Sequence, residues 1–186
     1  FAKEGKKTLL IDSDVQQTTM TWYALNDSSL DSLTVISSNK EGALKKFIEQ
    51  QKANYDYIII DGAPEVTRVM STSIATSDLV LVPLAPSGLD FWASESTADM
   101  VLQRQDISHT KGYFVFNRYP TRKTLLGGDL QDVVDNHEMP AMKTKIYDRV
   151  AYPDSLTQGS SALEWHDKKA KDEMVSLVKE IKEALA

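Results

Sequence analysis

Carboxylate and amide side chains stand at the ends of three short apolar runs in this sequence. The runs and their polar ends are 8–11 with Asp12 and Asp14, 57–60 with Asp61, and 113–116 with Asn117. A carboxylate is costly to bury alone, so each aspartate is expected to face a cleft, a cation or a partner charge. The hydroxyl and amide groups that crowd residues 12–19 suit an anion or metal site at a strand-to-helix turn.

A purely structural interpretation exists for two of these places. Residues 12–19 could be a capping run, in which Ser13 or Asp14 caps the next helix. We favour the ligand site, because two carboxylates directly follow a buried strand. Asn117 offers a donor and an acceptor that suit a purine edge. Because Pro120 follows shortly, the same asparagine suits a turn equally well.

The apolar runs predict strands of a parallel sheet, because they are short and lack the polar alternation of a half-exposed strand. They lie at 8–11, 57–60, 79–82 (followed by Pro83) and 113–116. The run at 57–60 is expected to be buried on both faces. Ligands of open α/β sheets bind beyond the carboxyl ends of the strands. The residues that follow these runs are therefore expected along one edge of the sheet.

Further elements are predicted between and after these runs. Helices are expected at 20–25, 41–53, 65–77, 91–104, 124–136 and 167–186, with a short helix interrupted at Pro153, and short strands at 33–36, near the sheet edge, and 143–146. The predicted fold is α/β, a doubly wound, mostly parallel sheet with helices on both faces, in a single domain over 1–186. The last helix mixes Lys with Asp and Glu on its polar face, so we expect it to dock on the domain.

Composition narrows the class of protein. The 186 residues suffice for one α/β domain, and 41% hydrophobic and 26% charged residues are ordinary for a soluble globular protein. The absence of cysteine excludes disulfides, thiolate zinc sites and cysteine nucleophiles. No apolar run approaches the roughly 20 residues that span a bilayer. The net charge of −6 means that any nucleic-acid binding would need a local basic patch.

Four motifs in order resemble the ParA/MinD group of deviant P-loop ATPases, and most nearly the small ParA-type plasmid-partition ATPases. They are Leu-Leu-Ile-Asp-Ser-Asp-Val-Gln at 9–16 (the family's Asp-x-Asp-Pro-Gln switch), Ile-Ile-Ile-Asp-Gly-Ala-Pro at 58–64 (its Walker B strand), the proline-bearing loop at 82–90, and Asn117-Arg118 after a late strand. Their order and spacing match over essentially the whole chain. Val15 departs from the pattern, because the family usually has proline there.

The resemblance implies roles for the matched residues, with ATP or ADP and Mg²⁺ as cofactors. Asp14 would position or activate the attacking water. Asp12 would support the magnesium and phosphate site, and Asp61 would bind Mg²⁺ through water. Nucleotide binding would involve Asp12, Gln16, Asn117 and Arg118, with Asn117 reading the adenine edge. These roles suit phosphoryl transfer, in which catalysis is mainly positioning and charge neutralisation.

The resemblance also implies partners. ATP would hold two subunits face to face as a homodimer, or build a higher assembly, and the ATP-bound form would bind DNA nonspecifically. A DNA-bound centromere-binding partner would stimulate hydrolysis, in a cytoplasmic, nucleoid-associated setting without a membrane partner. The candidate DNA contacts are Lys168, Lys169 and Lys171, or Arg122 and Lys123.

One family motif does not occur: the sequence contains no Gly-x-x-x-x-Gly-Lys-Ser/Thr. Residues 1–7 are typical of the last turn of a helix with Gly5 as its C-cap. We therefore expect the chain to be N-terminally incomplete, without the first strand and P-loop. Two other hypotheses stay open: a non-catalytic relative that acts as a binding module, and a MinD-like membrane-positioning ATPase, suggested by the terminal amphipathic helix.

Overall fold

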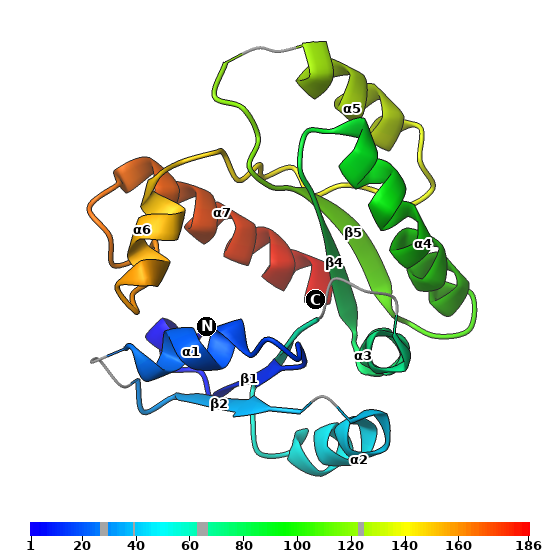
Figure 1. Ribbon diagram of the computed structural model, residues 1–186. Coiled ribbons are helices and arrows are strands. Elements are labelled where there is room, and N and C mark those ends of the chain that lie inside the picture. The colour runs from blue at the N-terminus through cyan, green and yellow to red at the C-terminus, as the bar shows by residue number, and fades with distance from the viewer. Residues whose placement is uncertain (27–29, 39, 63–66, 123–124) are drawn as a thin grey trace. The chain divides into compact units, whose positions relative to one another are not determined.

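The computed structural model describes residues 1–26, 30–38, 40–62, 67–122 and 125–186, and of residues 41 and 125–129 the backbone alone. The chain forms two compact units, a first unit of 1–76 with 156–160 and a second unit of 77–155 with 161–186. Each unit holds a parallel sheet flanked by helices (Figure 1). This arrangement confirms the predicted α/β class and its parallel strands.

The first unit is built on a three-stranded sheet. Its strands are β1 (Thr8–Asp12), β2 (Leu33–Ser37) and β3 (Tyr57–Asp61). β1 is central and pairs in parallel with β2 and with β3, so the predicted edge position of the strand at 33–36 is confirmed. The register sets Asp12 opposite Ser37 on one side and Asp61 on the other. The carboxyl ends of the three strands therefore share one edge.

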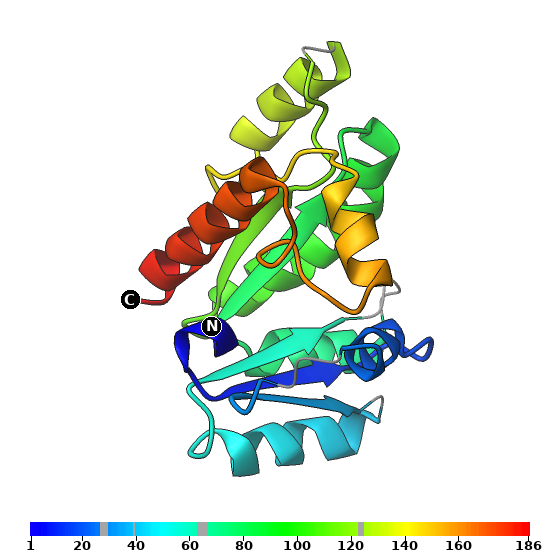
Figure 2. The ribbon, with the colours of Figure 1, turned by 90° about the vertical axis from the view of Figure 1, so that its left-hand side faces the viewer.

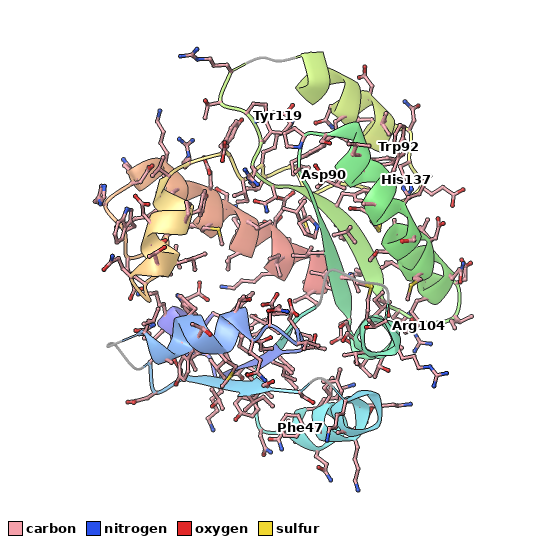
Figure 3. The ribbon with its side chains drawn as sticks, viewed as in Figure 1. Phe47, Asp90, Trp92, Arg104, Tyr119 and His137 are labelled. Atoms are coloured by element: carbon pink, nitrogen blue, oxygen red, sulfur yellow. The ribbon has the colours of Figure 1, made fainter. Side chains whose placement is uncertain are left out.

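One face of this sheet packs against α2, with α3 contributing to the same core (Figure 2). The helices of the first unit are the 3₁₀ helix η1 (Ala2–Glu4), α1 (Thr18–Ala24), α2 (Glu41–Gln51) and α3 (Arg68–Thr76). Leu9 and Ile11 of β1 are buried against Leu44 and Ile48 of α2. Partly buried hydrophobic side chains, among them Phe47 (Figure 3), surround this cluster. Gly5 ends η1 in the left-handed conformation, as expected for a C-cap.

β3 is less buried than its apolar sequence predicts. Ile59 is 38% exposed, and none of the five residues of the strand is fully buried. In the described part of the chain, β3 pairs with β1 alone and is an edge strand. The expectation of burial on both faces is therefore wrong for this strand, whereas Leu9 and Ile11 in the centre of the sheet fulfil it.

The second unit is built on the parallel pair β4 (Leu79–Leu84) and β5 (Lys111–Phe116). The later helices are α4 (Gly88–Gln105), α5 (Leu125–Asp135), α6 (Ala151–Thr157) and α7 (Lys168–Leu185). Figure 1 shows α7 and α4 on opposite sides of this pair. On the α7 side, Leu177 is buried with Val115, which confirms that the last helix docks on the protein. On the α4 side, Phe91 packs near Phe114, with ring centroids 6.0 Å apart.

Two prolines lie inside regular elements that they were predicted to end or interrupt: Pro83 in β4 and Pro153 in α6. β4 continues through Pro83, which lies opposite Val115 in the register. In the described residues β4 pairs with β5 alone, and an edge strand tolerates a missing N–H. Pro153 is the third residue of α6, where a helix has no intrahelical partner for an N–H. The predicted interruption at Pro153 is therefore wrong.

Residues 143–146 do not form the predicted strand. In the described part of the chain, the pairing of this region with β5 and the residues after it is limited to isolated bridges, from Phe114 to Ala141 and from Tyr119 to Tyr147. Between them, the backbone N–H groups of Lys143 and Thr144 donate to the Glu180 carboxylate on α7. The ladder is broken because a side chain replaces the neighbouring strand as the acceptor of these two groups.

Candidate functional site

Asp12 and Asp61 end neighbouring strands of the first unit and lie directly opposite each other in the register. Asp12 is fully buried and Asp61 is exposed. Ser13 ties the two strand ends together, because its N–H and its hydroxyl both donate to the Asp61 carbonyl oxygen, at 3.0 and 2.7 Å. The structure thus brings these two aspartates to one edge, as parallel strands require.

Asp12 is a capping residue for the loop and helix that follow it. Its Oδ1 accepts the N–H of Asp14 at 3.1 Å, and its Oδ2 accepts the N–H of Met20, in the first turn of α1, at 3.0 Å. The N-cap residue of α1, Gln17, makes no side-chain capping bond. The capping interpretation therefore applies to Asp12 and not to Ser13 or Asp14. A buried carboxylate with both oxygens hydrogen-bonded is satisfied.

The loop after β1 holds Asp14 half-buried in a tight turn. Asp14 Oδ1 accepts the N–H of Gln16 at 2.9 Å, and its Oδ2 has no hydrogen-bond partner among the described residues. Gln17 has a left-handed backbone, and its Nε2 donates to Ser37 Oγ at 3.1 Å. Val15, at the usual proline position, is 74% exposed at the turn. One carboxylate oxygen of Asp14 therefore remains available to a ligand.

Thr19 contacts the exposed aspartate. Its Oγ1 donates to Asp61 Oδ2 at 2.5 Å, joining α1 to the end of β3. The hydroxyl-rich run around Thr19 predicts a polar site, but nothing in its spacing distinguishes this threonine from its neighbours. Its role depends on which way α1 faces once Asp12 has capped it.

The oxygen donors at this edge fit a magnesium ion that keeps much of its water. Within the described residues there is no group of three or more His, Asp or Glu side chains placed to hold a metal ion. Magnesium is commonly held by one or two protein carboxylates together with water and substrate phosphates. Asp61 has an oxygen left to hold such an ion through water. Asp12, with both oxygens bonded, would support the site by fixing the loop.

Asn117 and Arg118 belong to the second unit. The Asn117 N–H donates to Leu84 O at 2.8 Å, and its Oδ1 accepts the N–H of Arg118 at 3.0 Å. Arg118 has a left-handed backbone with φ of 52° and lies 3.9 Å from Asp148 in an exposed ion pair. The asparagine therefore makes the expected turn and still has its Nδ2 donors for a ligand. Ala63, Pro64 and Lys123, which the sequence motifs include, lie outside the described residues.

Comparison with known proteins identifies relatives of this chain. Residues 28–110 match a protein-family model described as an AAA domain. Maintenance of carboxysome distribution protein A of Halothiobacillus neapolitanus is 22% identical over 176 residues, which cover 92% of this chain and 81% of that protein. Protein ParA of Rhizobium radiobacter is 23% identical over 106 residues, which cover 57% of this chain and 47% of that protein. These comparisons confirm the resemblance to ParA/MinD-type P-loop ATPases that the sequence motifs predict.

A solved structure has the same fold as this chain. The septum site-determining protein MinD of Pyrococcus horikoshii, complexed with Mg-ADP, superposes with a TM-score of 0.77 at 15% identity. The match covers 97% of this chain and 85% of that one. The carboxylates at the ends of β1 and β3 lie at the carboxyl edge of the sheet, where ligands of open α/β folds bind.

Proposed function

We propose that this chain is part of a ParA-type ATPase that partitions or positions a cargo. The observation that carries the proposal is the set of aspartates at one edge of the first unit. Both oxygens of Asp12 accept backbone N–H groups, whereas Asp14 and Asp61 each have one carboxylate oxygen without a partner among the described residues. The names of its relatives, which concern carboxysome distribution, septum-site determination and ParA, support a positioning or partitioning role.

In the proposed reaction, water attacks the terminal phosphorus of ATP, the bond from that phosphorus to the bridging oxygen breaks, and ADP and inorganic phosphate leave. Asp14 Oδ2 orients that water, and the bond from Gln16 to Asp14 Oδ1 keeps the carboxylate in place. Asp61 would hold Mg²⁺ through water, and the ion would supply charge neutralisation at the phosphates when it is bound. Asn117 offers Nδ2 to the adenine edge, and Arg118 lies beside it for nucleotide binding.

The proposed assembly is a nucleotide-dependent dimer, or a higher assembly, that binds DNA nonspecifically and is stimulated by a centromere-binding partner in the nucleoid-associated cytoplasm. The exposed charges of α7 are mixed in sign and do not form a continuous basic patch for DNA; they are Lys168, Lys169, Asp172, Lys179 and Glu183. Arg122 is exposed in the second unit and is the better candidate for a phosphate contact.

The membrane-positioning alternative receives less support. The apolar stripe of α7 is used inside the second unit, where Leu177 is buried and Met174 and Ile181 pack against the same cluster. A membrane-surface helix needs such a stripe free. Among the described helices, none combines the length and apolar character required to cross a bilayer.

The test replaces Asp14 by asparagine in the full-length protein. Asparagine can still accept the Gln16 N–H through its Oδ1, so the turn is kept while the charge is removed. We expect ATP turnover to fall about 100-fold or more, while binding of a fluorescent ATP analogue stays within twofold of the wild type. The control is Asp31→Asn, at an exposed turn position. In this control, turnover and binding should both stay within twofold. Unchanged turnover would reject the proposed role. Failure of the wild-type protein to bind the analogue with Mg²⁺ would favour the non-catalytic binding module.

A further inference from the structure

Asp61 is held at both its backbone and its side chain by the segment that runs from the end of β1 into α1. Ser13, at the start of that segment, donates twice to the Asp61 carbonyl oxygen. Thr19, in the first turn of α1 directly after the loop that follows β1, donates to the Asp61 carboxylate at Oδ2. The segment from Ser13 to Thr19 therefore fixes both the main chain and the side-chain carboxylate of Asp61.

The bond from Thr19 has the length of a hydrogen bond to an ionised carboxylate. O–H···O⁻ bonds are shorter and stronger than neutral ones, about 2.5–2.7 Å, and this one measures 2.5 Å. It occupies Oδ2 and restricts rotation of the Asp61 carboxylate. Oδ1 has no partner among the described residues and is left as the oxygen that can accept a hydrogen from a metal-bound water.

The neighbouring threonines show that this bond is specific. Thr21 donates its hydroxyl to Gln17 O at 3.1 Å, inside its own helix, as threonine commonly does. Thr18 is exposed, and no side-chain hydrogen bond of its hydroxyl is found in the described structure. Thr19 instead crosses to another element. The first turn of α1, which carries Thr19, is held in place because Asp12 accepts the N–H of the next residue, Met20.

We propose that Thr19 is a positioning residue for the divalent cation of this site. It holds Asp61 so that Oδ1 faces the hydrated ion, and it links the start of α1 to the occupancy of the metal site. This role rests on the proposed function, since it concerns the metal that the proposed reaction uses. Groups that orient a metal ligand typically change metal affinity about 10–100-fold when they are removed.

The test measures Mn²⁺ binding by electron paramagnetic resonance in the full-length protein with ADP, without any turnover. Thr19→Val removes the hydroxyl at nearly constant volume, and Thr19→Ala does so with the best helix-forming residue. We expect both to weaken Mn²⁺ about tenfold, the lower end of the range for such residues, because the bond is in an exposed setting. Thr19→Ser should restore binding to within twofold, and Thr18→Val, the matched control, should leave it unchanged.

The outcomes separate this inference from the proposed function. Wild-type Mn²⁺ binding together with equally tight binding by folded Thr19→Val or Thr19→Ala would overturn the role of Thr19 alone. Absence of Mn²⁺ binding by the wild-type protein with ADP would overturn the proposed function and this role with it. Circular dichroism on each variant identifies any that fails to fold, and the alanine variant then decides the result.

Discussion

The backbone N–H of Met20 donates to the carboxylate of Asp12, eight residues earlier, across 3.0 Å. Together with the bond from the Asp14 N–H, it uses both oxygens of a fully buried aspartate. Asp12→Ala would leave two backbone donors without an acceptor, so we expect the free energy of unfolding to fall by about 2–4 kcal/mol. Asp12→Asn should cost less, because one oxygen remains. Urea unfolding measures both. A cost as small as that of Asp31→Ala, in an exposed turn, would contradict the capping role.

A second prediction concerns Glu173, the acceptor at the centre of a nearly buried network. Its Oε1 accepts from Arg149 Nε and Nη2 at 2.8 and 2.6 Å, and its Oε2 accepts from the Tyr152 hydroxyl at 2.7 Å and the Tyr147 N–H at 3.2 Å. The bond to Glu173 raises the pKa of Arg149, and burial followed by the same carboxylate raises the pKa of Tyr152. Removing one partner of such a pair costs about 3–5 kcal/mol, which is the loss of unfolding free energy expected for Glu173→Ala.

The control for Glu173 is on the same helix. Glu183 pairs with Lys179 at 3.8 Å in an exposed i,i+4 arrangement, and exposed pairs of this kind contribute less than about 0.5 kcal/mol. Glu183→Ala should therefore leave thermal and urea unfolding almost unchanged. Equal losses for the two variants would show that the network around Glu173 does not stabilise the fold.

The stabilisation from Glu180 is expected to depend on pH. Burial alone would raise the pKa of its carboxyl, but the N–H groups of Lys143 and Thr144 outweigh burial and hold that pKa below its usual value. A lowered folded-state pKa stabilises the protein above the unfolded value of about 4.3, and the gain is lost as the pH falls through the folded value. The destabilisation by Glu180→Gln should therefore be largest at neutral pH and shrink below about pH 4.

Urea unfolding at a series of pH values measures the effect of Glu180→Gln. Glu49→Gln, at an exposed position on α2, is the control and should show no such trend. A cost of Glu180→Gln that stays constant from neutral to acid pH would contradict the proposed origin of the stabilisation.

A fourth prediction compares two left-handed glycines. Gly159 has φ of 66°, and an added Cβ would lie 2.4 Å from the backbone carbonyl of Leu25, whereas Gly5 has φ of 77° and nothing within 4 Å of such a Cβ. Gly5→Ala should cost only backbone strain, about 1–2 kcal/mol. Gly159→Ala adds a clash with backbone, and we expect about 2–5 kcal/mol. Differential scanning calorimetry measures both, and equal shifts would show that the segment moves away from Leu25 without cost.

The strands and the meeting of Asp12 with Asp61 could be predicted, because apolar runs and parallel strand ends are local signals. The apolar run at 57–60 did not reveal how much of β3 is exposed, since burial depends on which strands are its neighbours. The end of β4 was predicted too early, before Pro83, for the same reason. A proline ends a central strand but is tolerated in an edge strand.

The parts of the site and fold that could not be predicted depend on partners far away in the sequence. Thr19 contacts Asp61 42 residues later, and Thr144 donates to Glu180 36 residues later. The sequence pattern at 143–146 is that of a strand, and it does not reveal whether the N–H groups donate to a neighbouring strand or to a carboxylate. Tertiary contacts therefore decide the state of that stretch, and they also decide that Asp12 and not Asp14 caps α1.

The indole of Trp22 makes α1 optically observable. Its Nε1 donates to Ser160 O at 2.8 Å, so the ring is held between α1 and segment 156–160 of the same unit. In a protein with Trp92 and Trp165 replaced by phenylalanine, the remaining emission would come from the helix that carries Thr19. Release of that helix would expose the indole to water and shift its emission to longer wavelength. A change in the position of α1 on metal binding, which the proposed role of Thr19 implies, could then be timed in a stopped-flow instrument without any attached dye.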